Sequence, residues 1–207
     1  MKLILVRHGE TAWNRDGVVQ GQTDVELSEH GRRQAELVAL ALKDEPVEAI
    51  YASPLKRALE TAQAIARYHQ APLEIDACLM ELDAGELDGL TYQQMREGYP
   101  AFLKEWVKDA GPLKLPGGEC LQELQDRAWP CIERMQEKHP RGTVVVVSHN
   151  FALQTIICKA IGLKLSDFRR LRLAVAGLSI IDFSERGTAL TLFNDTCHLR
   201  AKPRQGE

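Results

Sequence analysis

The sequence has no apolar run that approaches the ~20 residues needed to span a membrane, which argues against a membrane protein. Its first apolar run, residues 3–6, is also far too short for the core of a signal peptide. Basic residues are not in excess, since 26 Lys and Arg stand against 29 Asp and Glu for a net charge of -3. Without a broad basic field, any anion site must be local. We therefore expect a cytoplasmic protein with neither a membrane nor a nucleic acid as partner.

Cysteine is also scarce, and the chain lacks any C-x-x-C pattern. The odd number and wide spacing of the cysteines argue against a disulfide framework or a zinc–cysteine site. We expect reduced, mostly buried thiols. The five are Cys78, Cys120, Cys131, Cys158 and Cys197.

The 207 residues contain no internal repeat, low-complexity tract or Ser/Gly linker. We therefore expect a single domain spanning residues 1–207, long enough to bury a full core. The only segment expected to be loose is the C-terminal RAKPRQGE, from Arg200 on.

What the sequence does contain is an alternation of apolar strands with amphipathic helices. Strands are predicted at residues 2–6, 49–52, 73–75 and 143–147, followed by a hairpin of strands 178–183 and 189–193. Helices are predicted from the cap Ser28 to about 43, from the cap Ser53 with Pro54 in the first helical position to about 69, and at 119–138 and 151–161. Continuous apolar strands that alternate with helices predict an α/β three-layer sandwich, with a mostly parallel sheet covered on both faces.

The stretch from about residue 83 to 118 breaks this rhythm. It is long, contains Gly and Pro, and carries several aromatic residues. We interpret it as an insertion of short helices over the edge of the sheet, a helical lid.

Polar clusters follow the ends of four predicted strands. They are Arg7-His8-Gly9-Glu10, the SPLKR segment at residues 53–57, Met80-Glu81 and Ser148-His149-Asn150. Because ligands bind outside the carboxyl ends of the strands in a doubly wound sheet, we expect these clusters to converge. The alternative for each is a hydrogen-bonded loop residue or a solvated acid.

Arg57 adds weight to the functional interpretation. It falls in the first turn of its helix, where the helix dipole disfavours a cation. An anion held jointly with Arg7 would explain this placement, although an outward-facing side chain paired with acids and water would as well.

Five motifs, in order along nearly the whole chain, match one family. They are RHGET with WN at residues 7–14, GQTDVEL at 21–27, SPLKRA with TA at 53–62, ELDAGELDG at 81–89, and SH at 148–149. On these motifs the chain resembles the histidine phosphatase superfamily, also called the phosphoglycerate mutase-like fold.

The resemblance implies a role for each matched residue. His8 would be the nucleophile that forms a phosphohistidine, with neutral imidazole favoured by the nearby cations Arg7 and Arg57. Those two arginines, with His149 and Asn14, would hold the phosphoryl oxygens. Glu81 would be the general acid, with its pKa raised in the occupied site. Contacts to the alcohol side are expected from Gln20, Gly21 and Thr23. No metal and no cofactor is implied.

The acid segment favours phosphatases over mutases. Mutases of this family read E-R-x-Y-G-x-L-x-G-x-x-K, whereas Leu82, Ala84 and Tyr92 stand here at the Arg, Tyr and Lys positions. The segment resembles broad-specificity and α-ribazole phosphatases instead. LPGGECLQEL, from residue 115, is similar to a P-G-G-E-S-x-x-E segment of the same group, with Cys120 in place of the serine.

We therefore expect a metal-independent phosphomonoester hydrolase that acts through a phosphohistidine on a small phosphorylated metabolite. α-Ribazole 5′-phosphate, phosphoserine, phosphoglycerates and sugar phosphates are all candidate substrates, and a homodimer is left open. The alternatives are a cofactor-dependent phosphoglycerate mutase and a non-catalytic phosphate-binding regulatory module. Candidate contacts to the alcohol portion are Tyr92, Arg96, Phe102, Lys104, Trp106 and Lys108.

Overall fold

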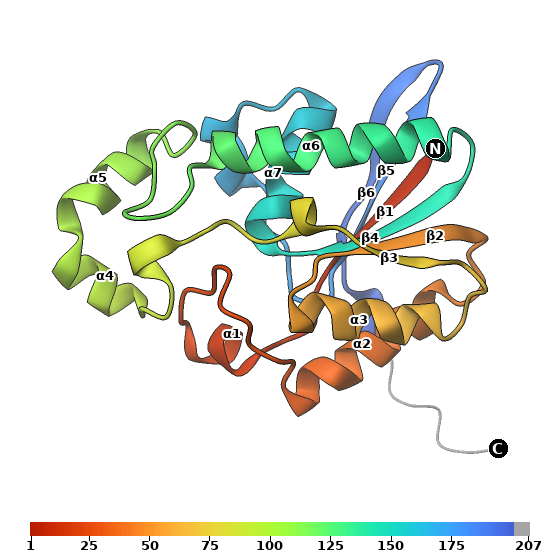
Figure 1. Cartoon of the computed structure of the whole chain (residues 1–207), viewed down its shortest axis with the longest axis horizontal. Helices are drawn as coiled ribbons and strands as arrows, with labels where there is room; N and C mark the ends of the chain where they lie inside the picture. Colours follow the sequence, from red (N-terminus) through yellow and green to blue (C-terminus); the bar gives the residue numbers. More distant parts are fainter. Residues whose placement is uncertain (201–207) are drawn as a thin grey trace.

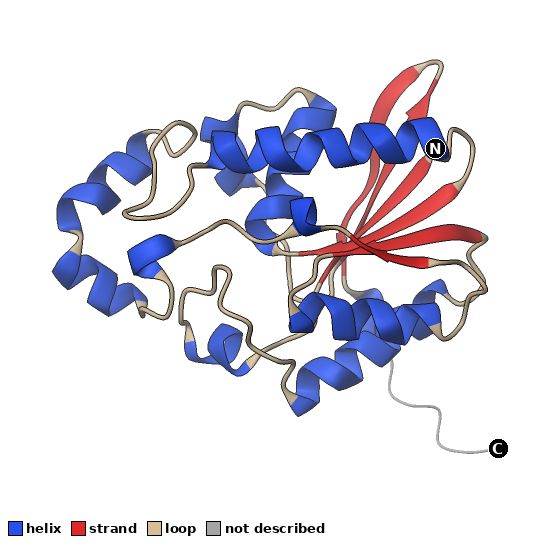
Figure 2. Cartoon of the chain, in the orientation of Figure 1, coloured by secondary structure: helices blue, strands red, loops and turns tan. Residues whose placement is uncertain are grey.

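One six-stranded sheet organises the protein in the computed structural model, which describes residues 1–200 (Figures 1 and 2). Most of the C-terminal segment expected to be loose lies outside these described residues. The sheet order is β3-β2-β4-β1-β5-β6, with β1 to β4 parallel and the β5–β6 hairpin antiparallel at one edge. The predicted α/β class is confirmed. The strands are β1 Lys2–Arg7, β2 Val47–Ala52, β3 Leu73–Ile75, β4 Thr143–Ser148, β5 Leu178–Ser184 and β6 Gly187–Asp195.

Both faces of the sheet are covered, as the continuous apolar strands predict. Leu3 and Leu5 of β1 pack against α6 (Leu121–Lys138) and α7 (Asn150–Ile161). Ile4 and Val6 point the other way, toward α2 (Glu29–Leu42) and α3 (Lys56–Ala66). Because side chains alternate along a strand, one apolar strand supplies two cores. The result is the expected three-layer sandwich (Figure 2).

The predicted start of α3 is wrong. The helix begins at Lys56 with Leu55 as N-cap and no side-chain cap bond, so Pro54 precedes the helix. The Ser53 hydroxyl is not free to cap it. That oxygen accepts from the Leu55 N–H at 3.3 Å and lies 2.8 Å from Nε2 of His149. Ser28, by contrast, caps α2 as predicted, accepting from the Gly31 N–H at 3.0 Å.

Short helices fill the stretch interpreted as a lid. They lie beyond the carboxyl ends of the parallel strands, away from the sheet (Figure 1). Trp106 stacks on Phe102 and packs edge-on against Phe151 of α7 and Phe168, which connects this segment to the main body. The helices are η2 Gly85–Leu87, α4 Tyr92–Gly98 and α5 Pro100–Lys108.

The remaining described elements are short. They are α1 Ala12–Asp16, η1 Ala77–Leu79, η3 Leu165–Arg170 and η4 Cys197–Arg200. Within residues 1–200, none of the helices combines the length and the apolar character that crossing a bilayer requires.

Candidate active site

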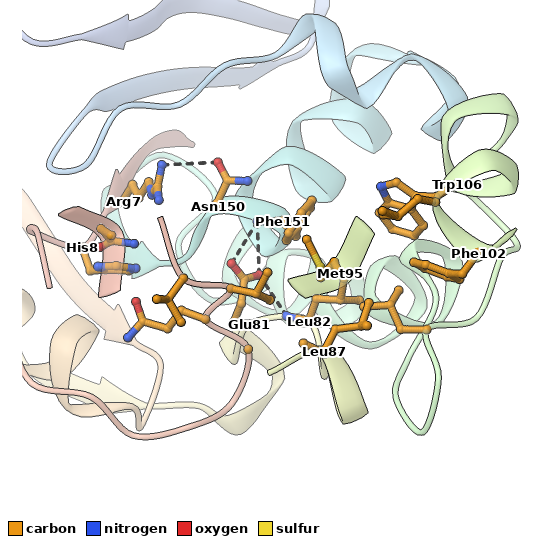
Figure 3. A pocket seen from close by; sticks show the side chains of 18 residues that line it. Arg7, His8, Glu81, Leu82, Leu87, Met95, Phe102, Trp106, Asn150 and Phe151 are labelled. Carbon is orange, nitrogen blue, oxygen red and sulfur yellow. Dashed lines mark hydrogen bonds between the residues drawn. The ribbon is translucent and has the colours of Figure 1, made fainter. Parts of the chain in front are cut away.

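A cavity opens at the carboxyl ends of the parallel strands, where the sequence predicts the polar clusters to meet. Arg7 and His8 of the β1 end lie at one end of it, near Glu81 and Asn150, while Phe102 and Trp106 lie at the other (Figure 3). The cavity is therefore polar at the end next to the strands and apolar at the end next to the short helices. Of the predicted site residues, those that line it are Arg7, His8, Asn14, Gln20, Gly21 and Glu81.

The tautomer of His8 follows from its hydrogen bond. Its Nδ1 lies 2.7 Å from the carbonyl oxygen of Gly9, which can only accept, so Nδ1 carries the proton and Nε2 keeps its lone pair. The ring is only 3% exposed. Burial lowers the pKa of His8 well below 6.5, and the charges of Arg57 and Arg7 lower it further. A neutral imidazole with a free Nε2 is the state that a nucleophile requires.

Arg7 is fixed on one side and free on the other. Its Nη1 donates to the Leu173 carbonyl and lies 3.5 Å from Oδ1 of Asn150. Its buried Nε has no hydrogen-bond partner. Because an unsatisfied buried donor is costly, this nitrogen indicates where an anionic oxygen would be accepted.

Arg57 and His149 lie fully buried behind His8 and do not line the cavity. Arg57 donates to the Gly21 carbonyl at 2.7 Å, the Thr23 carbonyl at 2.9 Å and Nδ1 of His149 at 3.2 Å. Three of the five N–H donors of its guanidinium are thus used, and two remain. Burial lowers the pKa of Arg57 to about 10, so the group stays charged at neutral pH.

His149 has the opposite tautomer to His8. Since its Nδ1 accepts from Arg57, the proton sits on Nε2, which donates to the Ser53 hydroxyl at 2.8 Å. Its ring centroid lies 5.1 Å from that of His8. Burial lowers the pKa of His149 well below 6.5, and the nearby charge of Arg57 acts in the same direction.

Glu81 is held by the beginning of α7. Its Oε1 accepts from the Leu82, Phe151 and Ala152 N–H groups at 2.9, 3.1 and 3.1 Å, and its Oε2 shares only the Phe151 N–H. The carboxylate thus satisfies helix N–H groups that the N-cap His149 leaves without a side-chain acceptor. Burial raises the pKa of Glu81, although these hydrogen bonds oppose the rise. Oε2 is the oxygen best able to carry a proton.

The loop from Gln20 to Thr23 is organised by Asp88. That carboxylate accepts from the Gly21 N–H at 2.9 Å, the Thr23 N–H at 3.0 Å and the Thr23 hydroxyl at 2.8 Å. Thr23 is exposed and does not line the cavity. Gln20 does, and its buried Nε2 has no partner because only its Oε1 is bonded, to the Thr11 hydroxyl.

The side-chain amide nitrogen of Asn14 is the atom left available to the cavity. Its Oδ1 accepts from the Thr11 N–H at 3.1 Å within the capping box of α1, so the oxygen is committed. The side chain lines the cavity, and its Nδ2 remains as a donor.

The half of the cavity beneath the short helices carries no charged side chain. Of the lid residues predicted to contact an alcohol, only Phe102 and Trp106 line it; Tyr92 and the cations at 96, 104 and 108 are exposed. The apolar residues that line the cavity are Val18, Val19, Leu82, Ala84, Leu87, Met95, Phe102, Leu103, Trp106, Leu115 and Phe151.

Three contributors were missed by sequence reasoning. Asp88 holds the Gln20–Thr23 loop, and Arg127 of α6 donates to the carbonyls of Cys78, Met80 and Glu81 at 2.8, 3.1 and 3.2 Å. Ser53, predicted as a cap, orients His149. Asp88 lies inside the ELDAGELDG motif at residues 81–89, which is a usable signal, whereas Arg127 in the middle of a helix offers none.

His8, His149 and Glu81 are not among the residues whose ligand atoms lie close enough together to hold a metal ion. Among the described residues, the one group of carboxylate and thiol ligand atoms close enough to hold a metal ion is Asp76, Cys78 and Cys131, which does not line this cavity.

Known proteins are similar to this chain in sequence and in fold. The chain is 37% identical over 199 residues to phosphoserine phosphatase 1 of Hydrogenobacter thermophilus, covering 96% of this chain and 94% of that one. The structure matches YhfR of Bacillus stearothermophilus with a TM-score of 0.90 at 27% identity, covering 96% and 98%. It matches the α-ribazole phosphatase of Shigella flexneri with a TM-score of 0.85 at 27% identity, covering 94% and 96%.

The family itself is identified by a match over most of the chain. Residues 3–196 match the sequence profile of the histidine phosphatase superfamily, branch 1. That span contains both histidines, both arginines and the glutamate described above. The chain is a member of the histidine phosphatase superfamily and a phosphatase.

Proposed function

We propose that the protein hydrolyses phosphomonoesters without a metal ion, through a phosphohistidine at His8. The observation that carries this proposal is the tautomer of His8, whose buried Nε2 keeps its lone pair beside two arginines. Nε2 attacks phosphorus as the ester P–O bond breaks. Water then attacks the phosphohistidine, the N–P bond breaks, and inorganic phosphate leaves.

Unused donors around His8 supply charge compensation. They are Nε of Arg7, the two free N–H groups of Arg57 and the amide nitrogens of Asn14 and Gln20. Fixed donors of this kind stabilise the charge on the equatorial oxygens of a transferring phosphoryl group without reorganisation during the reaction. His149 contributes by holding Arg57 and, in the occupied site, by redirecting its Nε2 proton from Ser53 to a phosphoryl oxygen.

Glu81 acts on the leaving group. Its raised pKa favours the protonated acid, and Oε2 delivers that proton to the leaving alcohol oxygen. The resulting carboxylate then takes a proton from the attacking water. A single carboxyl group therefore serves both half-reactions.

The apolar half of the cavity favours hydrolysis over mutase action. A mutase must retain a carboxylated phosphosugar acid while it is rephosphorylated, yet Leu82 and Ala84 are buried and Tyr92 is exposed at the three positions that would hold it. A carboxylate placed there would lose its hydration without gaining a partner, at a cost of several kcal/mol.

The same surface favours an uncharged, aromatic alcohol. We propose α-ribazole 5′-phosphate, whose benzimidazole base would lie among Phe102, Trp106 and Phe151. Phosphoserine, the substrate named for the Hydrogenobacter relative, carries an ammonium and a carboxylate that this half of the cavity leaves unpaired. α-Ribazole phosphatase is the name of one of the structural relatives.

The test is a phosphomonoester panel assayed in EDTA, with a 3-phosphoglycerate mutase assay alongside. We expect phosphate release from α-ribazole 5′-phosphate and aryl phosphates, with kcat/KM for phosphoserine at least tenfold lower. Rapid quenching should trap an acid-labile phosphoryl adduct that is absent in His8→Ala. Mutase turnover without phosphate release, an adduct that survives His8→Ala, or a preference for phosphoserine would each contradict the corresponding part of the proposal.

A further inference from the structure

Two cysteines that are 53 positions apart in the sequence face each other behind the Glu81 segment. Cys78 lies in η1 and Cys131 in α6, and their sulfurs lie within 4.8 Å of each other and of an Asp76 carboxylate oxygen. The Cys131 thiol donates to Oδ2 of Asp76 at 3.2 Å. Nη2 of Arg134 lies 2.9 Å from that oxygen and 3.1 Å from Sγ of Cys131. This arrangement is a dithiol with a proton acceptor and a cation beside it.

The cation argues for thiol chemistry over a metal ion. Arg134 already bonds to Asp76 and Cys131, two of the three groups that a metal ion would need as ligands. The other described cysteines have different settings: Cys120 caps α6, Cys158 is buried in the α7 core, and Cys197 is exposed in η4.

We propose that Cys78 and Cys131 form a reversible intramolecular disulfide when the protein meets a peroxide, and that closing it slows turnover by displacing Glu81. Cys78 is half-buried and therefore reacts first, since Cys131 is only 1% exposed. The Cys78 thiol gives up its proton, its thiolate attacks one peroxide oxygen, and the O–O bond breaks. The released hydroxide takes the proton that Cys78 lost and becomes water. Cys78 is then a sulfenic acid.

Cys131 completes the bond. Its proton passes to Asp76, its thiolate attacks the Cys78 sulfur, and the S–O bond breaks. The hydroxide leaves with the proton from Asp76 as a second water, so two thiols and one peroxide give one disulfide and two waters. Burial raises the pKa of the Cys131 thiol, and the neighbouring Cys78 and Asp76 raise it further, which agrees with its role as the second thiol to react.

The disulfide would act on the general acid through η1 and α6. A disulfide needs its sulfurs about 2.05 Å apart, so η1 must shift relative to α6 or both side chains must turn. Glu81 follows Cys78 by three residues, and Arg127, one turn before Cys131 on α6, holds the carbonyls of Cys78, Met80 and Glu81. A shift of η1 therefore loosens these bonds and moves the carboxyl group.

The experiment uses the full chain in EDTA, treated with hydrogen peroxide and then alkylated. Peptide mass spectrometry should show a Cys78–Cys131 cross-link that dithiothreitol removes, absent in Cys78→Ser and in Cys131→Ala. The kcat for an aryl phosphate should fall at least threefold on oxidation and recover on reduction. Both variants should resist this loss, while the matched control Cys197→Ser should respond like the wild type.

The effect on turnover depends on the proposed function, but cross-linking does not. Hydrogen exchange at residues 77–83, compared before and after oxidation, reports the movement even if no substrate is turned over. Absence of the cross-link, or a cross-link that changes neither hydrogen exchange nor kcat, would overturn this inference. Failure of the hydrolase assignment would show separately, as absence of turnover in the reduced protein.

Discussion

The two buried histidines should make the protein sensitive to mild acid. Both His8 and His149 have a pKa well below 6.5 in the folded state because of burial and the neighbouring arginines. The unfolded chain takes up protons at both positions as the pH falls through about 6.5, while the folded chain does not. Acid therefore favours the unfolded state, and the stability present above this pH is lost below it.

The magnitude follows from proton linkage. For each histidine that stays neutral in the folded state, the free energy of unfolding falls by about 1.4 kcal/mol between pH 7.5 and 5.5, and for two it falls by about 2.7 kcal/mol. Glu81 contributes with the opposite sign, because its pKa is raised by burial and protonation favours the folded state. Comparing each variant with the wild type at the same two pH values isolates the histidines.

Asparagine is the substitution that keeps one hydrogen bond of each histidine. In His8→Asn the amide nitrogen can donate to the Gly9 carbonyl as Nδ1 does, and in His149→Asn the amide oxygen can accept from Arg57. Urea unfolding at pH 7.5 and 5.5 should show each variant losing about 1.4 kcal/mol less than the wild type, and the double variant about 2.7 kcal/mol less. His30→Asn, at an exposed histidine, is the control. Variants with the wild-type pH dependence would refute the neutral, buried state of these histidines.

Three other substitutions test separate parts of the site. Glu81→Gln should lower kcat by about 10²- to 10⁴-fold in steady-state assays, while urea unfolding shows a stability at least equal to the wild type, because the amide oxygen still accepts from α7. Trp106→Ala should lower kcat/KM for aryl phosphates about fivefold and leave that for a small alkyl phosphate unchanged, measured side by side. Asp88→Asn should cost about 1–3 kcal/mol in urea unfolding and raise KM more than it lowers kcat, because one amide oxygen cannot replace both carboxylate oxygens.

The fold was predictable from the sequence because its signals are local. Apolar runs such as VVVV at residues 144–147 indicate strands buried on both faces, and the order of strands and helices implies the layers. The start of α3 was not predictable from the same signals. Ser53-Pro54 has the composition of a helix start, but a contact with His149, 96 positions away, engages the hydroxyl. A local rule cannot anticipate a partner at the start of another helix.

The convergence of the site was predictable for a topological reason, and its hydrogen bonds were not. Arg7, His8 and Glu81 meet because parallel strands end at the same edge. Asp88 and Arg127 meet their partners only through tertiary packing, so spacing along the chain carries no record of these contacts. The thiols of Cys78 and Cys131 are likewise brought together only by tertiary packing.

Arg57 shows how far a sequence anomaly can be interpreted. A cation in the first helical turn conflicts with the helix dipole, which indicates a compensating group without naming it. In the structure that group is two backbone carbonyls and one imidazole, from Gly21, Thr23 and His149. The side chain thus ties the Gln20–Thr23 loop to His149, and its two remaining donors are oriented by the three already engaged. The three hydrogen bonds that offset the unfavourable position of Arg57 in the helix are therefore the same bonds that preorganise the site.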